Sequence, residues 1–140
     1  MSTIHEQAMN HVYQQVLQRL IGHLNRASRT ALQLLVQRIV VAAGGMEQVG
    51  DFKVLVAHSG GEVSSYTLAL LRAAQLTIAG RSPKTFQIRV ATLRHAGMTQ
   101  ATLDSLNQGY AALFFHDDPR VELLMVENHE VLPFNHQRPV

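Results

Sequence analysis

The chain has 140 residues, of which 46% are hydrophobic and 16% are charged, and it contains no cysteine. A chain of this length can bury one hydrophobic core without disulfides, and its composition excludes an intrinsically disordered protein. The lack of cysteine excludes disulfides, thiolate metal sites and cysteine catalysis. No apolar run approaches the roughly 20 residues needed to cross a bilayer. We therefore expect a single soluble domain, residues 1–140, in a reducing cytoplasm.

The charges are distributed unevenly along the chain. Residues 1–100 carry ten basic and four acidic side chains, whereas residues 101–140 carry two basic and six acidic ones. Opposite charges on two parts of a chain can pair with each other, with a second copy or with a charged partner. The arginines are scattered and no set of aromatic stacking residues accompanies them, so a nucleic-acid partner is not expected.

The first 45 residues have a helical pattern. Apolar residues recur every four positions from Ile4 to Leu24, which predicts an amphipathic helix with one buried face. Polar residues at positions 25–30 leave open whether one kinked helix or two helices follow. From position 31 to 43 the pattern is apolar nearly all round, until two consecutive glycines end it. We expect residues 1–45 to pack on a sheet or to form a dimer interface.

Strands and helices alternate in the remainder of the chain. Short apolar or alternating runs predict strands at 52–57, 86–93, 111–115 and 121–127, with helices at 62–79 and 99–108. Only five residues separate the last two strands, which favours a hairpin there. The prediction is an α/β fold: a small three-layer sandwich with a mostly parallel four-stranded sheet, the last strand antiparallel, and one or two extra N-terminal helices. Residues 50–132 form its α/β core.

Polar residues follow the predicted strands. Carboxyl ends of parallel strands meet at one edge of a sheet, where ligands of α/β proteins bind. The candidate ligand-binding residues at this edge are His58, Ser59, Gly60, Gly61, His95, His116 and Asp117. Three of them, His58, His95 and His116, are candidate ligands of zinc or a similar ion if their loops converge.

The stretch "AHSGG" at 57–61 resembles the nucleophile elbow of the α/β hydrolases, G-x-S-x-G, with Ala57 at the first glycine position. In that family the serine lies on a sharp strand-to-helix turn and its partners follow in the order Ser, Asp, His. The resemblance covers five residues. It implies Ser59 as the nucleophile, Gly60 as an oxyanion donor, Asp117 or Asp118 as the acid, and His129 or His136 as the base.

The overlapping stretch "SGGEVS" at 59–64 is similar to the phosphate-binding loop of pyrophosphatase-type enzymes, S-G-G-x-D-S. Val63 stands where that family has its aspartate. A third interpretation needs no ligand, because Ser59 and Glu62 have the S-x-x-E spacing of a capping box in front of an apolar helix.

The expected function is that of a non-enzymatic regulatory or protein-interaction module. Its surplus apolar helices predict self-association as a homodimer, with a further protein partner possible and no cofactor. The alternative is a small hydrolase that uses Ser59, with Asp117 and His129 as its partners, or a histidine-lined metal or anion site at the strand ends.

Overall fold

The computed structural model describes residues 4–58, 62–82, 84–94, 98–127 and 130–134. The chain divides into two compact units. Residues 1–52 and 69–85 form the helical unit, and residues 53–68 and 86–140 form the sheet unit. None of the described helices is long and apolar enough to cross a membrane.

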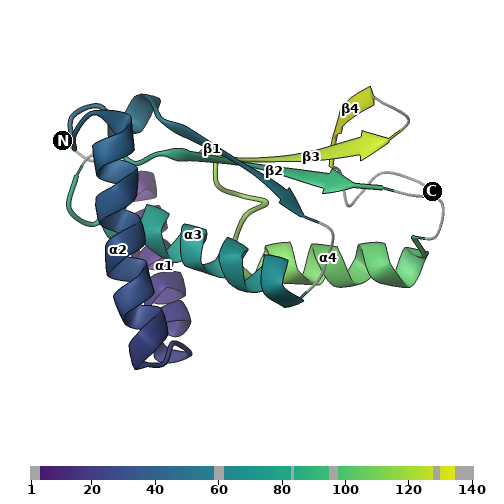
Figure 1. Ribbon diagram of the computed structural model, residues 1–140, viewed down its shortest axis with the longest axis horizontal. Helices are drawn as coiled ribbons and strands as arrows, with labels where there is room; N and C mark the ends of the chain where they lie inside the picture. The colour runs from purple at the N-terminus through teal and green to yellow at the C-terminus, as the bar shows by residue number, and fades with distance from the viewer. Residues whose placement is uncertain (1–3, 59–61, 83, 95–97, 128–129, 135–140) are drawn as a thin grey trace. The chain divides into compact units, whose positions relative to one another are not determined.

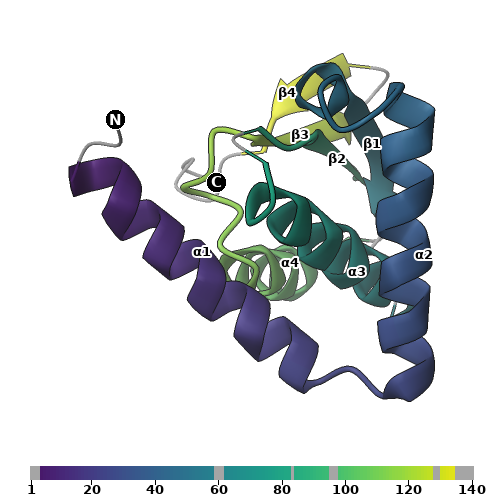
Figure 2. The same cartoon turned by 90° about the vertical axis from the view of Figure 1, so that its left-hand side faces the viewer.

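Two separate helices open the helical unit, α1 (Ile4–Gly22) and α2 (Arg26–Ala43), joined by a short loop (Figure 2). The second helix begins at Asn25, whose side chain caps α2 by accepting a 2.8 Å hydrogen bond from the Ser28 N–H. The chain therefore forms two helices here. Gly44, with φ of +95°, ends α2 in the left-handed conformation that glycine adopts without strain. The short 3-10 helix η1 (Val49–Asp51) follows.

The second half of α3 (Glu62–Ala79) completes the helical unit. Arg72 of this helix is fully buried. Its guanidinium donates a 2.6 Å hydrogen bond to Gln75 and lies 5.7 Å from the ring centroid of Tyr13 in α1. A guanidinium stays charged at any physiological pH, so its burial requires partners of this kind.

The sheet unit contains β1 (Lys53–His58), β2 (Gln87–Leu93), β3 (Val121–Glu127) and β4 (Glu130–Pro133) in the spatial order β1-β2-β3-β4 (Figure 1). The first three strands are parallel and β4 pairs antiparallel with β3. The predicted α/β class, with a four-stranded, mostly parallel sheet and an antiparallel last strand, is confirmed. The helix predicted at 62–79 matches α3.

The third predicted strand, at 111–115, is wrong. Helix α4 (Gln100–Ala112) continues past Gly109 into this segment, and a turn follows in which Phe114 has φ of +58°. Leu113 and Phe115 are buried in that turn, so an apolar run that resembles a central strand is explained by a packed helix end.

Because residues 111–115 are not a strand, the antiparallel hairpin lies between β3 and β4. Residues 121–127 follow α4 through a crossover and are therefore parallel to β2, not the antiparallel partner of a strand at 111–115. The antiparallel strand is β4, which the sequence did not predict.

The two faces of the sheet differ. Side chains alternate along each strand, and Ile88, Val90 and Thr92 of β2 point to a buried face. Right-handed crossovers between sequential parallel strands leave a sheet on the same side, so the connections through α3 and α4 share one face. The opposite face of the sheet is the one that these crossovers leave open.

Candidate functional site

Tyr110 of α4 is the centre of a buried polar cluster in the sheet unit. Its side chain is 1% exposed, and its phenol oxygen lies 2.8 Å from His58 Nδ1 and 2.7 Å from Thr92 Oγ1. His58 ends β1 and Thr92 lies opposite it near the end of β2. One helix residue therefore links the carboxyl ends of two neighbouring strands through two short hydrogen bonds.

Burial controls the protonation of this cluster. It lowers the pKa of His58 below the ordinary value, because an imidazolium loses hydration inside the protein. Burial also raises the pKa of Tyr110, an effect that the hydrogen bond with Thr92 partly offsets. Both groups are thus held in their neutral forms near pH 7.

The second ring nitrogen of His58 faces an exposed hydroxyl. Ser65 Oγ, in the first turn of α3, lies 3.5 Å from His58 Nε2. This is the long end of the hydrogen-bond range, where nucleophile–base pairs are often found without substrate. If Nδ1 of His58 donates to Tyr110, Nε2 is free to accept a proton from Ser65.

Aromatic rings surround Tyr110. Phe134, which follows β4, meets it edge-on with ring centroids 5.4 Å apart, and Phe115 lies at 6.2 Å. His116 also contacts the Tyr110 ring, at 6.4 Å. The structure therefore brings two of the predicted site residues, His58 and His116, to the same tyrosine, although His116 lies in the turn after α4 and not at a strand end.

The two predicted acidic residues have different surroundings. Asp118 is buried and accepts hydrogen bonds from the Arg120 backbone N–H at 2.9 Å and from its guanidinium at 3.0 and 3.1 Å. These bonds hold the turn that leads into β3 and leave Asp118 engaged in structure. Asp117 is exposed beside it.

Several predicted site residues lie outside the described part of the chain: Ser59, Gly60, Gly61, His95, His129 and His136. The proposed elbow, its capping-box alternative and the phosphate loop therefore stay predictions. In the part of the chain that is described, no three histidine, aspartate or glutamate side chains come together as a metal site would require.

Sequence reasoning missed Tyr110 because it ended the helix at Gly109. The spacing of Leu103, Leu106 and Tyr110, all buried, continues one helical stripe across that glycine. Thr99 was predicted to begin this helix, and it does: its hydroxyl accepts from the Thr102 N–H at 3.2 Å.

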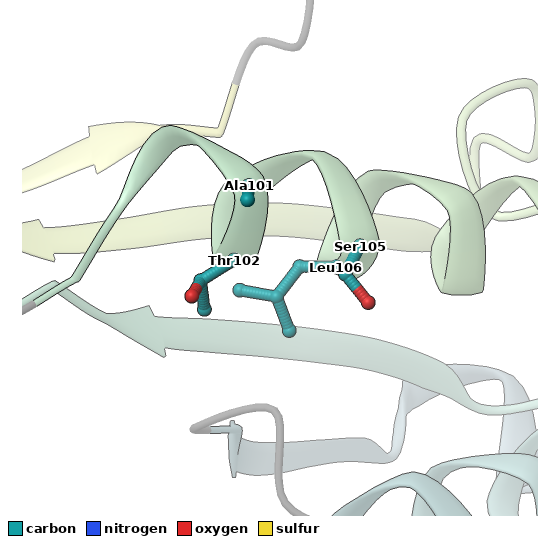
Figure 3. Close-up of a pocket in the computed structure, with 4 residues that line it drawn as sticks. All are labelled: Ala101, Thr102, Ser105 and Leu106. Carbon is teal, nitrogen blue, oxygen red and sulfur yellow. The ribbon is translucent and has the colours of Figure 1, made fainter.

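A small hollow of about 280 Å³ lies on the first two turns of α4 (Figure 3). Its lining consists of Ala101, Thr102, Ser105 and Leu106, two of which carry hydroxyl groups. None of these four lining residues is charged, so the described part of the hollow offers little to fix the orientation of a ligand.

The open sheet face is the second functional candidate. By the strand register it comprises Lys53, Leu55, Ala57, Gln87, Arg89, Ala91, Leu93, Glu122, Leu124, Val126, Val131 and Pro133. Three of its apolar residues, each from a different strand, are strongly exposed: Leu55 at 69%, Val131 at 62% and Leu93 at 45%. Larger exposed apolar patches mark interaction sites in soluble proteins.

Comparison with known proteins found no match, whether among family models, curated proteins or solved structures.

Proposed function

We propose that this protein is an interaction module that self-associates through the open sheet face. The observation that carries the proposal is the exposure of Leu55, Leu93 and Val131 on one face of the sheet, while the described apolar residues of the opposite face are buried or half-buried. Removing apolar surface from water stabilises an assembly by roughly 25 cal/mol per Å² before the costs of association.

The apolar residues of this face are organised in rows across the strands. One row consists of Ala57, Ala91, Leu124 and Pro133, which are paired in register. The next row contains Leu93, Val126 and Val131. In the part of the sheet that the structure describes, both rows are apolar, and they offer a surface against which a second sheet can pack at about 10 Å separation.

The charges next to these rows favour a second copy as the occupant. Arg89 and Glu122 are paired in register, and Arg89 Nε lies 3.7 Å from a Glu122 carboxylate oxygen. That Nε is buried and has no hydrogen-bond partner among the described residues. A two-fold axis parallel to the strands and between β2 and β3 would stack each Arg89 over the Glu122 of a second copy, which makes the face self-complementary.

The sequence predicted self-association through the N-terminal helices instead. Leu34 and Val41 of α2 support that route, since both are exposed and they lie seven residues apart on one side of the helix. Arg38 lies between them, so this helical surface is less continuous than the rows of the sheet face. Substitutions on each surface in turn show which of the two mediates self-association.

The test is the oligomeric state over a range of protein concentrations, measured by sedimentation equilibrium. The double variant L55E/V131E should weaken association by at least about tenfold while circular dichroism remains unchanged, because both side chains are exposed. The matched control L34E/V41E should associate like the wild type. A wild-type monomer at every concentration would overturn self-association, and loss of the dimer in the control alone would reassign it to α2.

A charge swap tests the stacking of Arg89 on Glu122. R89E should weaken association because it places two carboxylates together, and R89E/E122R should restore it. Equal association of the wild type, R89E and R89E/E122R would exclude this arrangement of the two copies.

A second candidate function is acyl hydrolysis, which the contact between Ser65 and His58 favours. Ser65 would attack an ester carbonyl while His58 Nε2 takes the hydroxyl proton and then delivers it to the leaving alcohol. Water would then attack the acyl–Ser65 ester with His58 Nε2 as the base, which releases the acid and returns a proton to Ser65 Oγ. Tyr110 would hold the imidazole in place, as the aspartate does in a catalytic triad. The first turn of α3 would direct its N–H groups at the developing oxyanion.

A fluorophosphonate probe decides this second candidate. Mass spectrometry should locate the label on Ser65, and both S65A and H58Q should abolish labelling. S59A provides the comparison for the predicted elbow nucleophile. Absence of labelling in the wild type would overturn the hydrolase, and labelling lost only in S59A would move the nucleophile to that residue.

A further inference from the structure

A cavity of about 370 Å³ lies within the helical unit, lined by the end of α1, one side of α2 and the end of α3. Its apolar wall is formed by Ile21, Leu32 and Val36, of which the last two are buried. The volume lies at the small end of the range for ligand-binding sites. None of its residues belongs to the open sheet face, so the inference is independent of the proposed function.

Two arginines line this cavity, Arg29 of α2 and Arg81 after α3. Neither forms an ion pair with any residue that the structure describes, and no acidic side chain is among the lining residues. Among the described residues, the Arg29 guanidinium donates one long hydrogen bond, of 3.5 Å, to the carbonyl oxygen of Ile21. Two guanidiniums that line one hollow from different segments can both donate hydrogen bonds to an anionic ligand there.

The wider unit has the same sign of charge. Residues 1–52 and 69–85 contain seven basic and three acidic side chains. This surplus raises the local concentration of anions near the cavity and increases their rate of binding.

The polar and apolar groups of the cavity run side by side along α2. Arg29, Gln33 and Gln37 are four residues apart and form one stripe, while Leu32 and Val36 form the adjacent stripe. A guanidinium binds a carboxylate through two parallel hydrogen bonds, and the glutamine amides can donate further ones. The side chains of the apolar stripe form no hydrogen bonds, so they favour contact with the hydrocarbon part of a ligand. A ligand that satisfies both stripes has an acidic head and an apolar body.

From this arrangement we propose that the helical unit binds a small amphiphilic carboxylate in this cavity. The head lies against Arg29 and Arg81, and the hydrocarbon covers Leu32 and Val36. Neither part alone suffices, because a bare anion leaves the cavity beside Ile21, Leu32 and Val36 unfilled and a neutral amphiphile leaves the arginines unpaired.

Decanoate, below its micelle concentration, is the probe, and isothermal titration calorimetry is the measurement. Decanol tests the hydrocarbon without the charge, and acetate and inorganic phosphate test the anion without the hydrocarbon. Decanoate should bind at least about tenfold more tightly than each of these three. Equal binding of decanol, or binding of phosphate as tight as that of decanoate, would overturn the proposal.

Charge-removing variants locate the site. R29Q and R81Q should each weaken decanoate binding by about tenfold or more. Both arginines are exposed, so the fold should persist. The matched control is R38Q, which removes an exposed arginine of α2 that does not line the cavity and should leave affinity unchanged. No binding by the wild type, or equal losses in all three variants, would overturn the site.

Discussion

Tyr110 and His58 form a buried hydrogen bond in the sheet unit, with the phenol oxygen 2.8 Å from Nδ1 of the imidazole. The same oxygen lies 2.7 Å from Thr92 Oγ1, so one hydroxyl serves two buried polar groups from different strands. Buried polar atoms are costly when they lose their partners. The first two predictions follow from this relationship.

The variant Y110F removes that hydroxyl and keeps the ring. We expect the free energy of unfolding to fall by about 1–3 kcal/mol, because His58 and Thr92 both lose a buried partner. Urea denaturation monitored by circular dichroism measures it. Y66F is the control, since Tyr66 is exposed on α3, and it should cost less than about 0.5 kcal/mol. Similar losses in the two variants would show that the cluster contributes nothing specific.

Stability should depend on pH through His58. Its pKa in the folded protein is below the ordinary value of 6.5, so between these two values the unfolded chain binds the proton more strongly. The free energy of unfolding should therefore be highest above pH 6.5, fall as the pH is lowered through this window, and level off below the folded pKa. Denaturation at a series of pH values measures the slope.

Variants assign that slope to one histidine. H58Q should flatten the dependence between neutral and mildly acidic pH, whereas H11Q, at an exposed position of α1, should retain it. An unchanged slope in H58Q would mean that another group is responsible.

Asp118 and Asp117 make a matched pair for testing the turn before β3. D118A removes the buried carboxylate that accepts three hydrogen bonds from Arg120, and we expect a loss of about 1–3 kcal/mol in unfolding free energy. D117A changes an exposed neighbour and should stay within about 0.5 kcal/mol of the wild type. Thermal and urea denaturation should agree on this order, and the reverse order would contradict the account of the turn.

The capping of α2 by Asn25 gives a prediction for the helical unit. N25A should cost about 0.5–2 kcal/mol, because the Ser28 N–H loses its acceptor. N25D should restore most of the stability, since aspartate caps helices equally well. If N25D is as unstable as N25A, the amide of Asn25 has a role other than capping.

Local patterns predicted most of the elements. The period of four in the first helix, the glycines after position 43 and the alternation at 86–93 depend on neighbours a few residues apart, and the structure has the helices α1 to α3 and the strand β2 where these patterns lie. The cap at Thr99 is equally local and is present. Site residues depend on contacts between distant segments, and sequence reasoning identified only His58 and His116 of the described cluster.

The error at 111–115 has a physical cause. Ala111 to Phe115 are apolar because the end of α4 and its turn are buried, and five apolar residues are compatible with a central strand or with a packed helix end. Only the packing of the Phe115 and Phe134 rings around Tyr110 distinguishes the two.

The sequence by itself determined the α/β class, the order of most elements and the separation of basic and acidic regions, because periodicity, turn residues and charge are properties of short segments. The tertiary structure decided which strand is parallel to which, that Tyr110 joins His58 to Thr92, that apolar rows share one open face, and that Arg29 and Arg81 share one cavity. These are contacts between residues far apart in the chain. They depend on how the elements pack, which short-range patterns do not encode.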